Sequence, residues 1–164
     1  MITLKTFDHT PRLAELKIAY KRTRGRRHKQ ASGGYMLRSE LQVAEYLRTI
    51  WDDDTIDLRE EFVLLCLDTS LTVLGWVKLH TGSLDASLVD PRLVFGVALQ
   101  TASAAIIVAH NHPSGNVEPS VQDITLTKRL AEGAKLLGLR FVDHLILNRN
   151  RSFSFASAGL LDVK

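Results

Sequence analysis

Cysteine is nearly absent from the sequence: Cys66 stands alone, so no disulfide can form within the chain. Cys66 lies in the apolar run FVLLCLD, where a free thiol behaves as a small buried hydrophobic group. Long hydrophobic runs are absent too, because none approaches the roughly 20 residues that a helix needs to cross a bilayer. The first residues, MITLKTFDHTPRL, lack the basic start and apolar centre of a secretory signal. These absences predict a cytoplasmic protein with a reduced thiol and no association with a membrane.

Acidic residues are missing from residues 17–30, KIAYKRTRGRRHKQ, which carry seven Lys and Arg side chains. The whole chain has a formal net charge of only +3, so this one segment accounts for its basic character. Poor apolar periodicity predicts that residues 1–38 form an extended or mobile basic arm and that residues 39–164 form one folded domain. The arm could neutralise several phosphates, so nucleic acid is a candidate partner through residues 17–30. A solvated arm, or one that pairs with another subunit, is the alternative.

Apolar periodicity in residues 39–164 predicts alternating helices and strands. Two apolar runs separated by the polar turn DTS favour an antiparallel hairpin, and short uniformly apolar runs favour buried strands. Elements in this order predict an α/β fold whose mixed sheet is covered by helices on both faces. In chain order, we expect a helix after Ser39, the strands EFVLLCLD and LTVLGWVKLH, a helix from Pro91, the strand AAIIVAH, a helix over residues 120–137, the strand LRFVDHLILN and a short strand in SFSFA.

Apolar residues at helical spacing predict which face of each helix is buried. We also expect both tryptophans, Trp51 and Trp76, to fill the core. The predicted buried positions are Leu41, Ala44 and Leu47 in the first helix, Leu93, Val94, Val97 and Ala98 in the second, and Ile124, Ala131, Ala134 and Leu137 in the third.

Residues 109–123, AHNHPSGNVEPSVQD, place two histidines, a turn and an aspartate in one short stretch. His110 and His112 share a face at the end of a buried strand, about 7 Å apart along the chain, and Asn111 faces the other way. Asp123 lies in the first turn of the following helix, which can return it to the same place. Two imidazoles and one carboxylate form a ligand set that leaves one position open for water, as in catalytic zinc sites.

A structural explanation of the same residues is available. SVQD fits a capping box, in which Ser120 and Asp123 only close the start of a helix. The histidines could be polar residues at the end of a strand. The combination of all four side chains at this spacing favours the metal site.

The spacing H-x-H, seven residues, then S-x-x-D resembles the motif of the JAMM (JAB/MPN) metalloprotease superfamily, matched by His110, His112, Ser120 and Asp123. The longer string HNHPSGNVEPSVQD, with the segments REEF, DPRLVFGVAL and VDHLIL, resembles its RadC-like branch over about residues 39–162. The resemblance implies a cytidine-deaminase-like, three-layer α-β-α sandwich and a zinc ion.

The resemblance also implies a general base on the first strand, and the pattern Glu-x-Phe selects Glu60 over Glu61. Strand alternation places Glu60 on the same side as Phe62, which supports this choice. From the residues alone, Glu60 could equally be a solvated acid before a strand. His144, in VDHLIL, is expected to be a buried, hydrogen-bonded histidine, with support of a metal ligand as the alternative.

These expectations predict a zinc-dependent hydrolase that cleaves an amide, in a peptide or an isopeptide, by metal-activated water. Glu60 would take a proton from the water and pass it to the leaving amine, and Ser120 would donate a hydrogen bond to the oxyanion. The alternative is a DNA-associated RadC-like accessory protein whose arm binds nucleic acid and whose metal site is structural or has an unknown substrate. A nucleoside deaminase is disfavoured, because Pro113-Ser114-Gly115 supplies no thiol ligands.

Overall fold

The computed structural model describes residues 3–6, 14–17, 35–81 and 89–161. The chain divides into two compact units, residues 1–30 and residues 31–164. In the first unit, β1 (Thr3–Thr6) pairs antiparallel with β2 (Ala14–Lys17), a strand pair that the sequence pattern did not predict. The basic segment 17–30 lies outside the described residues apart from Lys17, so the arm and its binding of nucleic acid stay predictions.

The second unit contains, in chain order, α1 (Glu40–Ile50), β3 (Glu61–Leu67), β4 (Val73–Thr81), α2 (Pro91–Gln100), β5 (Ala105–Asn111), α3 (Val121–Leu136), β6 (Arg140–Leu147) and β7 (Ser152–Ser154). Its strands form one mixed sheet in the order β4-β3-β5-β6-β7. β5 and β6 are parallel, because α3 lies between them in the chain and returns it to the same end of the sheet. The other neighbouring strands are antiparallel.

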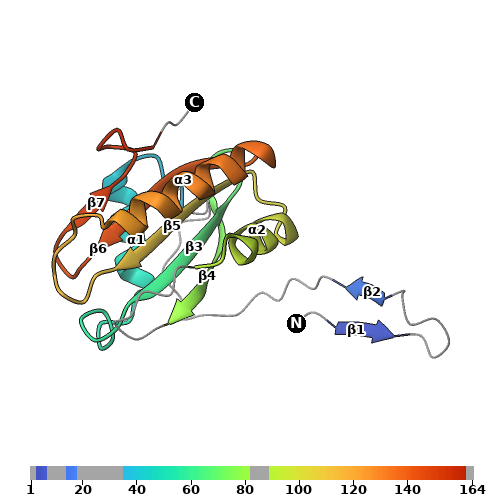
Figure 1. Ribbon diagram of the computed structural model, residues 1–164, viewed down its shortest axis with the longest axis horizontal. Coiled ribbons are helices and arrows are strands. Elements are labelled where there is room, and N and C mark those ends of the chain that lie inside the picture. The colour runs from blue at the N-terminus through green and yellow to red at the C-terminus, as the bar shows by residue number, and fades with distance from the viewer. Residues whose placement is uncertain (1–2, 7–13, 18–34, 82–88, 162–164) are drawn as a thin grey trace. The chain divides into compact units, whose positions relative to one another are not determined.

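Helices cover both faces of this sheet (Figure 1). α1 packs on one face, where Leu47 shares a hydrophobic core with Val63 and Ile107. α2 and α3 pack on the other face, where Leu130 shares a second core with Leu64. β3 and β5 are buried over their whole length, because they lie inside the sheet and between both helical layers. The predicted three-layer α-β-α sandwich with a mixed sheet is confirmed.

Each helix buries a somewhat different face from the one that its apolar residues predicted. Leu41, Leu93 and Leu137 were wrongly placed in the core, because their exposed fractions are 66%, 54% and 42%. The difference is largest in α3, where two polar residues, Asp123 and Thr127, occupy the buried face. The buried positions are Val43, Ala44 and Leu47 in α1, Val94 and Ala98 in α2, and Asp123, Leu126, Thr127, Leu130 and Ala134 in α3.

The sequence also predicted that Trp51, Cys66 and Trp76 are buried in the core. Trp51 and Cys66 are buried as expected, and Cys66 is a free thiol. The prediction for Trp76 was wrong: its exposed fraction is 44%, because β4 is the outermost strand of the sheet on its side. Within the described ranges, no helix has both the length and the apolar character that a membrane crossing requires.

The carboxyl end of β5 is where the candidate site forms. β3 runs antiparallel to β5, so the first residues of β3 lie beside the last residues of β5, and Phe62 is opposite His110. α3 starts with its N-cap residue Ser120 after the loop that follows β5. Residues from three separate segments are therefore brought to one edge of the fold.

Candidate metal centre

The two histidines come from the end of β5, as the sequence predicted. His110 is buried within the strand, and His112 follows the strand where the chain leaves the sheet. The main-chain N–H of His112 donates to the carbonyl of Leu147 at 3.1 Å. The Nδ1 of His112 lies 2.8 Å from the carbonyl oxygen of Asn116. A carbonyl oxygen can only accept, so Nδ1 carries the proton and a neutral His112 presents an unprotonated Nε2. That nitrogen is the one that faces His110.

Asn111, between the histidines, faces the opposite side of the sheet, also as predicted. Its Oδ1 accepts a hydrogen bond from the N–H of Glu61 at 2.7 Å. Its Nδ2 donates to the carbonyl oxygens of Ile56 and Arg59, at 2.6 and 2.8 Å. The sequence did not predict these bonds, which fix the start of β3 against the end of β5.

Asp123 reaches the site from the first turn of α3, where the capping box is also present. Ser120 donates to Oδ2 of Asp123 through its N–H at 2.8 Å and through its hydroxyl at 2.6 Å, while the N–H of Asp123 donates back to the Ser120 Oγ at 3.1 Å. The other carboxylate oxygen, Oδ1, lies 3.1 Å from Nε2 of His110. Both explanations of Asp123 are therefore correct, since the capping box orients one carboxylate oxygen and leaves the other facing His110.

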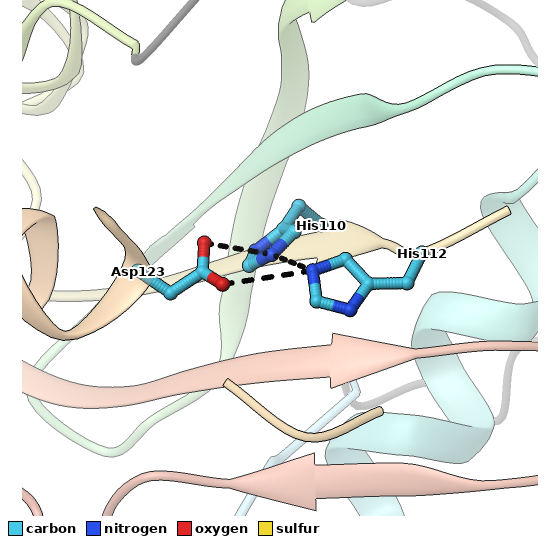
Figure 2. Close-up of side chains that lie close together, drawn as sticks. All are labelled: His110, His112 and Asp123. Atoms are coloured by element: carbon cyan, nitrogen blue, oxygen red, sulfur yellow. Dashed lines mark hydrogen bonds and ion pairs between the residues drawn. The ribbon is translucent and has the colours of Figure 1, made fainter. Parts of the chain in front are cut away.

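His110, His112 and Asp123 form the group in the described residues that could hold a metal ion (Figure 2). The Nε2 atoms of the two histidines are 3.0 Å apart, and Nε2 of His112 is 3.6 Å from Oδ2 of Asp123. Ligands of a tetrahedral zinc ion, bound at about 2.0–2.1 Å, are about 3.3 Å from one another. The donor atoms and their spacing therefore fit a divalent ion such as zinc.

The charges of the group favour a cation. Burial by itself raises the pKa of the Asp123 carboxyl, but the adjacent imidazoles of His110 and His112, together with the hydrogen bond from Ser120, outweigh burial and hold this pKa well below its usual range. The nearby Asp123 carboxylate raises the pKa of His112, against the opposing effect of burial. The carboxylate is therefore ionised at neutral pH, and an imidazole in contact with it can exchange its proton for a metal ion.

The adjacent glutamates at the start of β3 have different surroundings. Glu61 is fully buried and pairs with Lys78 at 2.6 Å and with Arg59 at 3.0 Å. Glu60 instead lines a cavity of about 220 Å³ beside the histidines, and its charge contributes to the raised pKa of His112. This placement agrees with the choice of Glu60 over Glu61, although the role of Glu60 as a base stays a prediction.

The same cavity joins the remaining candidate residues. Phe62 faces it on the same side as Glu60, and its ring is parallel to that of His110 at a centroid distance of 6.1 Å. Ser120 lies on the cavity wall next to Asp123, so the sequence-predicted residues are all brought together. The lining is Glu60, Phe62, His80, Val89, His110, His112, Ser120, Gln122, Asp123 and Leu126.

His144 is buried in β6, directly behind His110. Its Nε2 lies 2.9 Å from Nδ1 of His110, and its Nδ1 lies 2.7 Å from the hydroxyl of Thr127 in α3. Burial lowers the pKa of His144 well below its ordinary value, so the ring is neutral. The expected buried, hydrogen-bonded histidine is present, and it contacts the metal group as well. No pattern in the sequence pointed to Thr127.

The fold and the site together define a mixed α/β domain with a His-His-Asp group that could bind a metal ion at the end of its central strand. Residues 37–160 match the model of the RadC-like JAB domain, and the chain belongs to this family. Its fold agrees with the JAB/MPN, cytidine-deaminase-like architecture that the resemblance implied.

Relatives of the chain are proteins named UPF0758. The chain is 45% identical to the one from Methanosarcina barkeri over 103 residues, which cover 63% of this chain and 45% of the relative. It is 40% identical to the one from Thermotoga maritima over 126 residues, or 76% of this chain and 54% of the relative. For the one from Geobacillus sp., the identity is 39% over 137 residues, or 82% and 59%. The chain thus spans about half the length of the curated relatives that it matches.

Proposed function

We propose that the domain is a zinc-dependent hydrolase of the JAMM type, which cleaves an amide bond in a peptide or an isopeptide. The observation that carries the proposal is the convergence of three donor atoms, from β5, from the residue that follows it and from α3, at the spacing of tetrahedral zinc ligands. His110 and His112 would bind the ion through Nε2, and Asp123 through its carboxylate. Three protein ligands leave a coordination position open, which is the pattern of a catalytic rather than a structural zinc site.

A zinc ion held there would supply a Lewis acid that lowers the pKa of a bound water and polarises the carbonyl of the substrate. Glu60 is the residue that we assign as general base, because its side chain lines the same cavity as the three donors. A carboxylate in this position can accept a proton from water and return it to the leaving amine. Glu61 is unsuited to this task, since both of its carboxylate oxygens are engaged by Arg59 and Lys78.

Ser120 is the residue that we assign to the oxyanion that develops on the substrate. Its hydroxyl hydrogen points to Oδ2 of Asp123 in the structure, and rotation about the C–O bond redirects it into the cavity. Asp123 then keeps the hydrogen bond from the Ser120 N–H, so the ligand stays oriented. A hydrogen bond that forms mainly with the developing charge stabilises the transition state more than the substrate.

The test is cleavage of a peptide library that includes lysine-linked isopeptides, using the zinc-loaded full chain. We expect cleavage by the wild-type protein, and loss of cleavage with retention of zinc in Glu60→Gln. Glu45→Gln is the matched control, because Glu45 is exposed on α1 at the opposite face of the sheet. Absence of cleavage across the library, or full activity in Glu60→Gln, contradicts the proposal.

A further inference from the structure

A chain of buried hydrogen bonds links two of the metal-binding residues behind the site. It runs from Nδ1 of His110 to Nε2 of His144 at 2.9 Å, and from Nδ1 of His144 to Oγ1 of Thr127 at 2.7 Å. Oγ1 of Thr127 then donates to the main-chain carbonyl of Asp123 at 2.6 Å. All four residues are buried, so water does not replace these bonds. This series of hydrogen bonds joins β5, α3 and β6, three elements that follow one another in the sequence.

The donor and the acceptor in each of these hydrogen bonds follow from the last group in the series, the main-chain carbonyl of Asp123. The carbonyl of Asp123 can only accept, so the single hydroxyl hydrogen of Thr127 is donated to it. Oγ1 of Thr127 must then accept from Nδ1 of His144. A neutral His144 therefore has a bare Nε2, which accepts the proton on Nδ1 of His110. It follows that the unprotonated nitrogen of a neutral His110 is Nε2, the atom that faces Asp123 and His112.

Aromatic rings hold both histidines in this arrangement. The ring of Phe155 stacks on His144 with a centroid distance of 4.8 Å and an interplanar angle of 10°. The ring of Phe62 lies parallel to that of His110, with a centroid distance of 6.1 Å. Because the rings are packed between neighbours, a rotation of either imidazole that would exchange its two nitrogens is sterically opposed.

We infer that His144 and Thr127 are positioning residues that fix the tautomer of His110 and so present its Nε2 to a metal ion. The inference rests on the metal site of the proposed function. Neither residue contacts the cavity, so both act through His110 and through the backbone of Asp123. Hydrogen bonds to the second nitrogen of a metal-binding imidazole commonly set its tautomer and its affinity for the ion.

Removal of the Thr127 hydroxyl is the sharpest test, because Thr127→Val keeps the shape of the side chain. Without that acceptor, His144 can move its proton to Nε2, which drives the His110 proton to its own Nε2 and blocks the ligand atom. We expect zinc affinity, measured by competition with a chromophoric chelator, to fall by about 10–100-fold. Thr127→Ser should restore it. Thr125→Val is the matched control, since Thr125 makes the same type of bond to a carbonyl of α3 but is exposed.

A purely structural role for the pair would leave the histidine tautomers unchanged, so these are measured directly. In the zinc-loaded wild-type chain, ¹⁵N NMR of the imidazoles should show a proton on Nδ1 of both His110 and His144. The same measurement decides the matter if Thr127→Val does not fold. Zinc-bound wild type with a proton on Nε2 of His144, or Thr127→Val with unchanged affinity, overturns the inference and leaves the metal site intact. Wild-type protein that binds no zinc overturns the proposed function along with the inference.

Discussion

Asn111 offers a quantitative test of how the site is assembled, through the variant Asn111→Ala. The side chain is fully buried and makes three hydrogen bonds, from the Glu61 N–H and to the carbonyls of Ile56 and Arg59. Each buried hydrogen bond contributes about 1 kcal/mol net, and an unsatisfied buried partner adds to the loss. We therefore expect Asn111→Ala to lower the free energy of unfolding by about 3 kcal/mol.

The assay is urea unfolding in the presence of a chelator, so that metal binding does not contribute to stability. Asn111→Asp should lower the free energy of unfolding by at least as much, because a carboxylate oxygen would replace the amide group that donates to two carbonyls. Asn116→Ala is the control: Asn116 is exposed, and its side chain accepts a single bond from the Glu118 N–H. A loss below about 1 kcal/mol in Asn111→Ala would refute the argument that these bonds fix the start of β3.

Three further predictions concern the neighbouring residues. Glu61→Gln removes the buried partner of Lys78. Because Lys78 can regain water, we expect the free energy of unfolding, measured in urea, to fall by about 1–3 kcal/mol. An unchanged free energy of unfolding would contradict a stabilising ion pair. Ser120→Ala removes the N-cap of α3 and should cost about 1 kcal/mol in thermal unfolding; a loss of zero would show that the cap is dispensable. The raised pKa of His112 means that the metal-free folded state binds its proton more tightly than the unfolded state does. That contribution is complete below about pH 6.5 and is lost as the pH rises through the folded pKa, so stability relative to His112→Gln should fall as the pH is raised above about 6.5. A rise in relative stability over that range would contradict the assigned sign.

The sequence was sufficient to predict those parts of the site whose positions depend only on local strand and helix geometry. A strand places His110 and His112 on one face and Asn111 on the other, and a helix start places Ser120 and Asp123 together. All of these positions agree with the structure. The order of buried strands and helices was also sufficient to predict the three-layer arrangement, because a sheet of uniformly apolar strands must have helices packed on both of its faces.

The rest of the site depends on pairing between distant segments, which local patterns do not contain. His144 lies behind His110 only because β6 pairs in parallel with β5. Thr127 lies on the buried face of α3 together with Asp123, so a search for apolar positions selected the adjacent face and placed Leu137 in the core. Trp76 was misplaced for a related reason, since the sequence does not say which strand is outermost.

The most direct test of the account is the zinc content of the purified full chain after dialysis against buffered zinc. We predict about one equivalent of zinc per chain in the wild type and in Glu60→Gln, because Glu60 is not a ligand. His112→Ala should lose the bound zinc while its fold, followed by circular dichroism, is retained, because His112 is only partly buried. A wild-type chain that binds no zinc, or a His112→Ala chain that binds it as well as the wild type, would contradict the central claim.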